Sequence, residues 1–301
     1  MTSKIALTFL GTGDQIPSRI RNHTSILLSF NEENILFDCG EGTQRQFRKA
    51  DLNPCKITRI LISHWHGDHV LGLPGILSTL ASSGYSKTLF IYGPKGIKEK
   101  IKKTLEVFSF YKNYEIKIEE ISQGIFYEGK NFYLEAEEME HGIPALAYSF
   151  TEKGNSRIDK EKLEKSGLPE GPILQKLKSG EDVTYKGKKF KSKDLVYKEE
   201  NKKISIVLDT KLNKRILPFI KDSNIFVCEG TYSEDLKKEA EERMHMTVSQ
   251  AADVAKKGKV KKLIITHIGS RYSKNIKELL SEAKNIFPET TFARDLDKIE
   301  I

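Results

Sequence analysis

The chain has 301 residues, with 50 Lys and Arg against 42 Asp and Glu, and 38% of its residues are hydrophobic. This is the composition of a soluble globular protein with a heavily charged surface, long enough to bury a sizeable core. The net charge of +8 favours a polyanionic partner such as nucleic acid, although a Lys/Glu-rich surface typical of thermophiles would have a similar charge.

Three scattered cysteines, Cys39, Cys55 and Cys228, exclude a disulfide framework and a cysteine-based metal site. We therefore expect a reducing, cytoplasmic location. The first residues lead directly into a strand without a signal peptide, and no apolar run is long enough to span a membrane. We expect no membrane partner.

Apolar runs bounded by turn residues predict the secondary structure of the first half. Strands are expected at 5–10, 24–30, 34–38, 57–62, 89–92, 115–121, 132–139 and 145–150. Helices are expected from about 44 to 50, at 73–82 and at 94–108.

In the second half, strands again alternate with helices. Strands are expected at 204–209, 224–228, 262–266 and near the C-terminus, and helices before His245 and at 248–257 and 275–286. Polar residues follow the strands in both halves. The pattern predicts an α/β fold with a sheet-on-sheet core flanked by helices.

Residues 153–200 differ from the rest, with 13 Lys and Arg, 9 Asp and Glu, several Gly and Pro and few large apolar residues. Such a segment is not expected to bury much of a core by itself. We expect a single domain over residues 1–301, with 153–200 inserted as a flexible, protruding arm. A solvated loop is the alternative.

The segment Ser63–His69 places three histidines and an aspartate directly after an apolar strand. Imidazole and carboxylate are common ligands of zinc and similar divalent ions. His64 and His66 point the same way along an extended segment, while Asp68 and His69 lie past a turn. The spacing therefore predicts ligands for two metal ions.

Further ligands are expected at the ends of other strands. His141 and His267 follow two strands, and Asp209 ends a third. A carboxylate at such a point can bridge two ions, so we predict His64, His66 and His141 on one metal, Asp68, His69 and His267 on the other, and Asp209 between them. Taken singly, a strand-end Asp is often a turn residue and a lone His a structural one.

With these motifs in place, the chain resembles the metallo-β-lactamase superfamily and, within it, the short form of ribonuclease Z. The resemblance covers nearly the whole chain, from the segment Phe9–Asp14 and the segment Phe37–Gln44, through the metal loop, to Thr266 and His267. It implies an αβ/βα sandwich with two metal ions, most simply Zn²⁺ with Mn²⁺ as an alternative, at one edge of two facing sheets.

Three features point to ribonuclease Z rather than to the superfamily in general. A basic loop contains Arg19, Arg21 and Asn22, with Arg19 where the family usually has Lys. The arm resembles the exosite with which this family grips tRNA, through Gly171 and Pro172 and the lysines Lys176, Lys178, Lys186, Lys188 and Lys189. The third feature is the pair of Glu229 and His245.

The resemblance implies removal of the 3′ trailer from precursor tRNA. A metal-activated hydroxide would attack the phosphodiester after the acceptor stem and leave a 3′-hydroxyl on the tRNA. Asp68 would be ligand and base, and His245, held by Glu229, the general acid. A homodimer is also implied, with the arm of one subunit serving the other. The alternatives are another phosphodiesterase or a 3′ exonuclease of this fold, and a non-catalytic RNA-binding protein.

Overall fold

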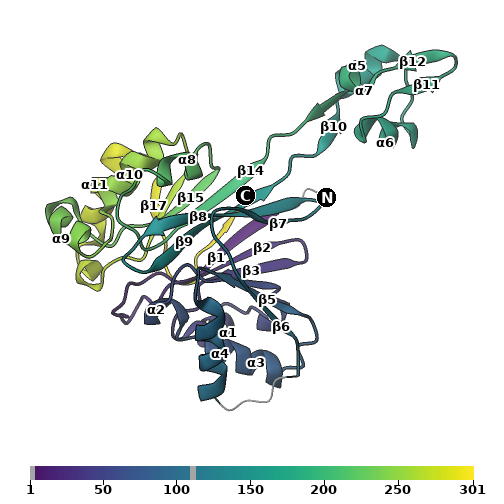
Figure 1. Ribbon diagram of the computed structural model, residues 1–301. Helices are drawn as coiled ribbons and strands as arrows, with labels where there is room; N and C mark the ends of the chain where they lie inside the picture. Colours follow the sequence, from purple (N-terminus) through teal and green to yellow (C-terminus); the bar gives the residue numbers. More distant parts are fainter. Residues whose placement is uncertain (1–3, 109–112) are drawn as a thin grey trace.

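The computed structural model describes residues 4–108 and 113–301, and residues 1–3 and 109–112 lie outside that description. Within the described residues, two seven-stranded sheets face each other, and helices cover their outer faces (Figure 1). This confirms the predicted α/β sandwich. A third part, between β9 and β14, projects away from the sandwich.

The first sheet has the strand order β18-β1-β2-β3-β4-β5-β6. β18, β1, β2 and β3 pair antiparallel, and β3 to β6 pair parallel. The strands are β1 (Ile5–Gly11), β2 (Ser25–Phe30), β3 (Glu33–Phe37), β4 (Arg59–Leu61), β5 (Leu89–Gly93), β6 (Ile116–Glu120) and β18 (Lys298–Glu300).

The second sheet repeats this plan in the order β17-β16-β15-β14-β9-β8-β7. β14 to β17 pair parallel, and β14, β9, β8 and β7 pair antiparallel. The strands are β7 (Gly124–Glu128), β8 (Phe132–Glu140), β9 (Pro144–Glu152), β14 (Lys202–Val207), β15 (Ile225–Glu229), β16 (Leu263–Thr266) and β17 (Thr290–Phe292). β7 is an edge strand that the sequence did not predict, because its side chains are mostly exposed.

The core lies between the two sheets, where Phe9 and Phe37 of the first meet Tyr148 and Phe150 of the second. A second apolar cluster lies under α8 and α10, and a third under α1 and α3. β9 is buried along nearly its whole length, because it is covered on both faces. The apolar run at 145–148 is typical of such a strand.

The predicted helices of the sandwich agree with the observed ones within a few residues, but α8 (Ile216–Ile220) was not predicted. Within the described residues, no helix is long and apolar enough to cross a membrane. The α-helices are α1 (Thr43–Lys49), α2 (Gly67–Val70), α3 (Leu73–Ser82), α4 (Ile97–Val107), α8 (Ile216–Ile220), α9 (Lys237–Glu242), α10 (Val248–Lys257) and α11 (Ile276–Ile286). Short 3₁₀ turns are η1 (Pro54–Lys56), η2 (Glu234–Leu236) and η3 (Ser270–Ser273).

The arm has a small core of its own, and here the sequence-based expectation was wrong. Leu163, Leu177 and Phe190 are among six buried apolar residues that pack together. They were overlooked because they are spread singly among charged residues. The elements of the arm are β10 (Ser156–Ile158), α5 (Lys160–Ser166), α6 (Ile173–Lys178), β11 (Val183–Tyr185), β12 (Lys188–Phe190), α7 (Ser192–Leu195) and β13 (Val196–Lys198).

Candidate metal centre and active site

The loop after β4 presents four of the predicted ligands. His64 and His66 lie on its extended part, and His66 is the N-cap of the short helix α2. Asp68 and His69 lie in the first turn of α2, where the chain has changed direction. The extended part and the helix therefore direct their side chains to two neighbouring positions.

The other ligands come from the ends of strands in the second sheet. His141 follows β8, Asp209 follows β14 and His267 follows β16, while Glu229 is the last residue of β15. β14, β15 and β16 are parallel, so their carboxyl ends meet at one edge of the sheet. His267 adopts a left-handed backbone conformation with φ of 54°, which is uncommon for a residue with a side chain.

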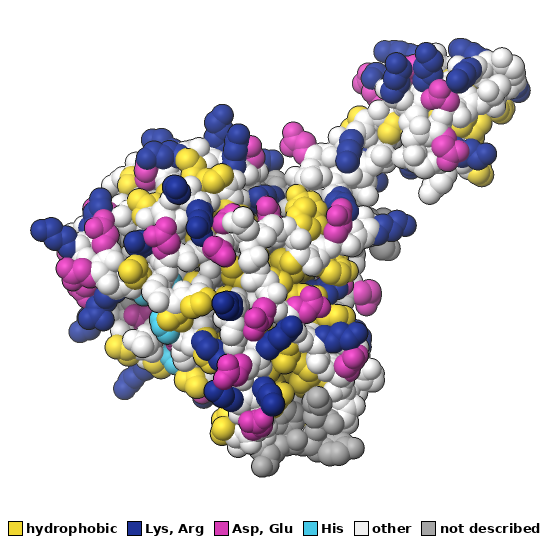
Figure 2. Space-filling model, in the orientation of Figure 1, with side chains coloured by type: hydrophobic (Ala, Val, Ile, Leu, Met, Phe, Trp, Pro, Cys, Tyr) yellow, Lys and Arg dark blue, Asp and Glu magenta, His cyan; other side chains and the backbone are white. Residues whose placement is uncertain are grey.

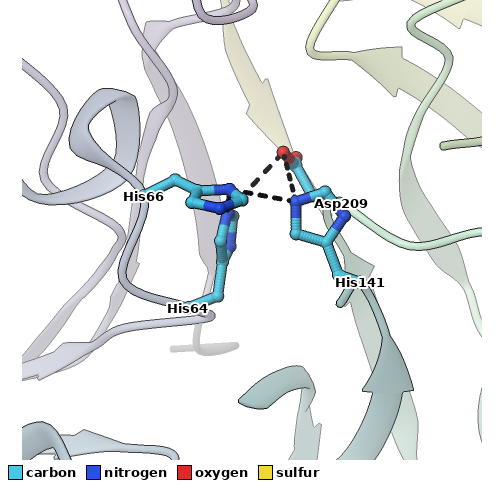
Figure 3. A group of neighbouring side chains, drawn as sticks. All are labelled: His64, His66, His141 and Asp209. Atoms are coloured by element: carbon cyan, nitrogen blue, oxygen red, sulfur yellow. Dashed lines mark hydrogen bonds and ion pairs between the residues drawn. The ribbon is translucent and has the colours of Figure 1, made fainter. Parts of the chain in front are cut away.

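His64, His66, His141 and Asp209 form one group of converging side chains (Figure 3). Nδ1 of His66 lies 3.1 Å from Nε2 of His64 and 3.1 Å from Nε2 of His141. Asp209 Oδ2 lies 3.7 Å from His64 Nε2 and 3.6 Å from His141 Nε2. Three ring nitrogens and a carboxylate oxygen thus face a common point.

Asp68, His69, His267 and Asp209 form the second group. His69 Nε2 lies 3.3 Å from both Asp68 Oδ2 and Asp209 Oδ2. His267 Nε2 lies 3.4 Å from Asp68 Oδ2 and 3.2 Å from Asp209 Oδ1. Asp209 therefore belongs to both groups and stands between them.

Hydrogen bonds on the far side of four rings orient them for metal binding. His64 Nδ1 lies 2.9 Å from Ser63 Oγ, and His69 Nδ1 lies 2.6 Å from Asp38 Oδ2. His141 Nδ1 lies 2.9 Å from the Met244 carbonyl oxygen, and His267 Nδ1 lies 2.9 Å from Thr231 Oγ1. With its proton on Nδ1, a neutral imidazole turns the lone pair of Nε2 toward the centre.

Two buried atoms at the centre support the same conclusion. Within the described residues, His69 Nε2 and Asp209 Oδ1 form no hydrogen bond. Buried polar atoms normally have a partner, and a cation would satisfy both. The donor set of nitrogen and oxygen fits a divalent metal. These His and Asp groups form a divalent metal site.

The electrostatics differ among the ligands. Burial lowers the pKa of His69 and His267, but the charge of Asp209 outweighs this and raises the pKa of both rings, so each would release a proton on binding a cation. Burial lowers the pKa of His64 well below its ordinary value, and the neighbouring ring of His69 adds to this, so His64 is neutral. Burial alone would raise the pKa of Asp68, but hydrogen bonding to His267 and His69 holds it well below its usual range. Asp68 is therefore ionised.

Glu229 and His245 form a pair beside this centre. The Nδ1–H of His245 donates to the Glu229 carboxylate, at 3.0 Å from each oxygen, and Glu229 is fully buried. Burial lowers the pKa of His245, but the Glu229 charge outweighs this and raises the pKa to about 9. The backbone N–H of Thr210 and the hydroxyl of Thr231 also donate to Glu229.

An open cavity of about 310 Å³ gives access to the centre. Members of both ligand groups and His245 line it, together with residues to which the sequence analysis assigned no role in the site. These additional residues are Asp14, Gln15, Ile16, Thr231, Tyr232, Arg243 and Arg271.

The basic loop differs from its prediction at two positions. Arg19 is exposed, but the Arg21 guanidinium is buried and donates to Thr12 Oγ1 and the Ala293 carbonyl, at 2.6 and 2.7 Å. The Asn22 side chain donates to the backbone carbonyl of Glu41. Arg21 therefore holds the loop to the sandwich instead of facing a ligand, which corrects its prediction as an RNA-binding residue, and Asn22 is similarly engaged.

The predicted arm residues lie on the projecting part of the molecule. Gly171 and Pro172 are exposed before α6, and the five arm lysines are exposed as well. They do not approach the metal centre (Figure 1).

Asp38 is the main residue that the sequence reasoning missed. It accepts hydrogen bonds from the backbone and hydroxyl of Ser63 at 2.7 and 2.6 Å, and from His69. Its φ of 54° places the carboxylate beneath the metal loop. Its position at the end of a predicted strand, like that of Asp209, was the available signal.

Comparison with known proteins gives results that agree with this geometry. A family model described as anti-Pycsar protein Apyc1 matches residues 5–132. The metallo-β-lactamase-fold protein YhfI from Bacillus subtilis superposes with a TM-score of 0.72 over 100% of both chains, at 16% identity. The chain is thus a metallo-β-lactamase-fold protein with a metal site at the edge of its sheets.

More specific relatives are similar over nearly the whole chain. Ribonuclease Z from Listeria monocytogenes is 43% identical, over 98% of this chain and 99% of its own. The short form of human tRNase Z has a TM-score of 0.71 and 26% identity, over 98% of both chains. The chain belongs to the ribonuclease Z family.

Proposed function

We propose that this protein is an endoribonuclease that removes the 3′ trailer from precursor tRNA. Membership of the ribonuclease Z family supports this activity. The single observation that carries it is the buried Glu229–His245 pair beside seven converging His and Asp side chains. Hydrolysis of a phosphodiester needs both an activated water and a proton for the departing ribose oxygen, and these two features would supply them.

The two ligand groups would hold two divalent ions, most simply Zn²⁺, with Mn²⁺ as an alternative. The predicted assignment remains as proposed, with His64, His66 and His141 on one ion, Asp68, His69 and His267 on the other, and Asp209 shared. When bound, such ions lower the pKa of water and offset negative charge on the phosphoryl oxygens.

Asp68 would orient the attacking water, and His245 would donate a proton to the leaving oxygen. Because Asp68 is ionised, it can accept a hydrogen bond from the attacking water and orient it; its low pKa makes it a poor store for the proton. His245 donates through Nδ1 to Glu229, so its Nε2–H is available to the leaving 3′-oxygen. The products would be tRNA with a 3′-hydroxyl and a trailer with a 5′-phosphate.

The substrate would be held mainly through its phosphates. The exposed Arg19 lies on the loop adjoining the cavity and would contact phosphate near the cut. The exposed arm lysines Lys176, Lys178, Lys186, Lys188 and Lys189, with Gly171 and Pro172, would contact the body of the tRNA. Such contacts read the shape and backbone of an RNA, which suits a substrate defined by its fold.

We also propose a homodimer, which the direction of the strands supports. The arm leaves the second sheet at the end of β9 and returns at the start of β14, opposite the carboxyl ends of β14 to β16 that carry the metal ligands. An arm pointing away from its own site is placed to serve a second subunit. Three free cysteines suit a reducing compartment, and we propose a cytoplasmic enzyme.

The proposal is tested by comparing two substrates. The metal-loaded protein should cleave a 3′-extended precursor tRNA far more efficiently than bis(p-nitrophenyl) phosphate, because only the RNA reaches the arm. Metal analysis should find two ions in the wild type and a reduced content in His141→Ala. Equal efficiency on both substrates would instead indicate a small-molecule phosphodiesterase.

A further inference from the structure

Three lysine-bearing segments meet at the end of the second sheet opposite the metal centre. They are the turn after α8, the turn between α10 and β16, and the start of β14. Backbone hydrogen bonds join the two turns: Asp222 N–H donates to the Gly258 carbonyl at 2.8 Å, and Lys261 N–H donates to the Ser223 carbonyl at 2.9 Å. The lysines on these turns therefore occupy fixed positions on one surface.

Five lysines make up what we call the lysine surface: Lys221, Lys256, Lys259, Lys261 and Lys262. The first four are exposed and the last is half-buried. None of the five forms an ion pair with a residue that the structure describes, whereas their neighbour Lys257 is paired with Asp253 at 2.6 Å. Figure 2 shows Lys and Arg side chains gathered over the region of α8 and α10.

The backbone of Lys259 is unusual, because it adopts a left-handed conformation with φ of 52°. Glycine and asparagine fit this conformation more easily than lysine does. Lys186, at the tip of the β11–β12 hairpin in the arm, has the same feature, with φ of 47°. Both turns present a lysine outward at a position that disfavours a long side chain.

The arm and the lysine surface share one end of the sheet. The arm returns to the sandwich at Lys202, the first residue of β14, and β14 pairs in parallel with β15, which in turn pairs with β16. An RNA held by the arm would extend over the end of the sheet from which the arm emerges. Unpaired lysines there would meet its phosphates.

We propose that the lysine surface binds the phosphate backbone of the tRNA body, on the same subunit whose arm holds that RNA. This inference rests on the proposed function. RNA that the arm holds would thus also contact the sandwich, at a distance from the cleaved phosphodiester. The lysine surface contributes to the affinity for tRNA but does not contact the reacting groups. It recognises the charge of the RNA backbone and not the base sequence.

The test is a triple variant of the full-length, metal-loaded protein, with Lys256, Lys259 and Lys261 each changed to Gln. Binding of a precursor tRNA is measured across a range of salt concentrations, in an Asp68→Ala background so that the RNA stays intact. Three lost phosphate contacts should make the slope of log affinity against log salt shallower by about 2–3. We expect the affinity for RNA at low salt to fall at least tenfold. When the three lysine changes are made without Asp68→Ala, hydrolysis of bis(p-nitrophenyl) phosphate should stay unchanged.

A matched control removes the same charge elsewhere, by changing Lys98, Lys102 and Lys103 of α4 to Gln. It should bind RNA as the parent does. Changing the three surface lysines to Arg should retain affinity, which separates a charge effect from a folding defect.

The inference is overturned if the surface variant binds with the parent's affinity and salt slope, or if the α4 control loses as much. In that case, cleavage of precursor tRNA by the wild-type protein would leave the proposed function standing. Failure of the wild type to bind or cut any precursor tRNA would instead overturn the proposed function.

Discussion

At the residue scale, four of the metal-facing histidines are each held by a second group behind the ring. Two hydroxyls have matching roles: Ser63 donates to Asp38 and accepts from His64, and Thr231 donates to Glu229 and accepts from His267. Each hydroxyl thereby links a ligand to a buried carboxylate. This arrangement fixes ring orientation before any ion binds, which favours tight and selective binding.

The metal loop could be predicted from sequence because its residues are contiguous, so their spacing alone determines where they point. The supporting groups could not. Asp38 is far from His69 in the chain, and the group behind His141 is the backbone carbonyl of Met244, which no side-chain pattern encodes. Arg21 was wrongly predicted to face a ligand because sequence does not show which charged residue of a loop turns inward.

Replacing Asp68 should separate chemistry from binding. In Asp68→Ala, an ion at the second ligand group would lack one ligand and the attacking water would lack its hydrogen-bond acceptor, so we expect cleavage of precursor tRNA to fall by at least about a thousandfold. RNA binding in gel-shift assays should change little, because phosphate contacts lie elsewhere. Glu119→Ala, at an exposed position on β6, is the control and should behave as wild type. Full cleavage by Asp68→Ala would refute the site.

The pH dependence should report on the pair of His245 and Glu229. A general acid must be protonated, so the rate falls as pH rises through the pKa of His245, which the Glu229 charge raises to about 9. Bound cations would lower this pKa in wild type and variant alike. In Glu229→Gln the raising charge is gone, so the alkaline limb of the kcat profile should move to lower pH.

The measurement is kcat for precursor tRNA from pH 6 to 10 in both proteins. An alkaline limb that stays in place in Glu229→Gln would argue against His245 as the acid.

At the scale of elements, α10 positions the acid. Its capping box has Thr247 Oγ1 accepting from the Gln250 backbone N–H at 3.1 Å, and Gln250 Oε1 accepting from the Thr247 N–H at 3.0 Å. His245 lies two residues before this cap, so the start of the helix fixes the loop that carries it. The sequence predicted both ends of α10, because the cap and the apolar spacing are local signals.

Removing the cap should affect stability and turnover together. Thr247→Ala should lower the free energy of unfolding by about 1–2 kcal/mol. It should also lower kcat, since His245 is less well placed. Urea denaturation and kinetics measure the two effects. Asp159→Ala, which removes the N-cap of α5 in the arm, should leave the stability of the sandwich and turnover on a small diester unchanged.

At the scale of the whole molecule, the two sheets have the same plan, with parallel strands on one side and antiparallel strands on the other. The rhythm of strands and helices was enough to predict this sandwich. The arm's location was predicted too, but not its fold, because its small core depends on which scattered apolar residues meet. The directions of β9 and β14 place the arm at the end of the second sheet opposite the metal ligands, and the sequence alone does not show these directions.

Together with the proposed homodimer, this separation predicts that two defective subunits can complement each other. One carries Asp68→Ala with an intact arm, and the other lacks residues 153–200 but has an intact site. Each homodimer should cleave precursor tRNA poorly, whereas the mixed dimer should regain a substantial part of wild-type activity, because one arm serves the other site. Mixed dimers isolated by two affinity tags, with no gain over the separate homodimers, would mean that each arm acts in its own subunit.

Under the proposed function, the metal centre cuts precursor tRNA once, just after the acceptor stem. The most direct test is to incubate the metal-loaded protein with a 3′-extended precursor labelled at both ends and to map the products at nucleotide resolution. We expect a single cut that leaves a 3′-hydroxyl on the tRNA and an intact trailer with a 5′-phosphate, and no cut after chelation. A ladder of mononucleotides released from the 3′ end, or an untouched precursor, would contradict the claim.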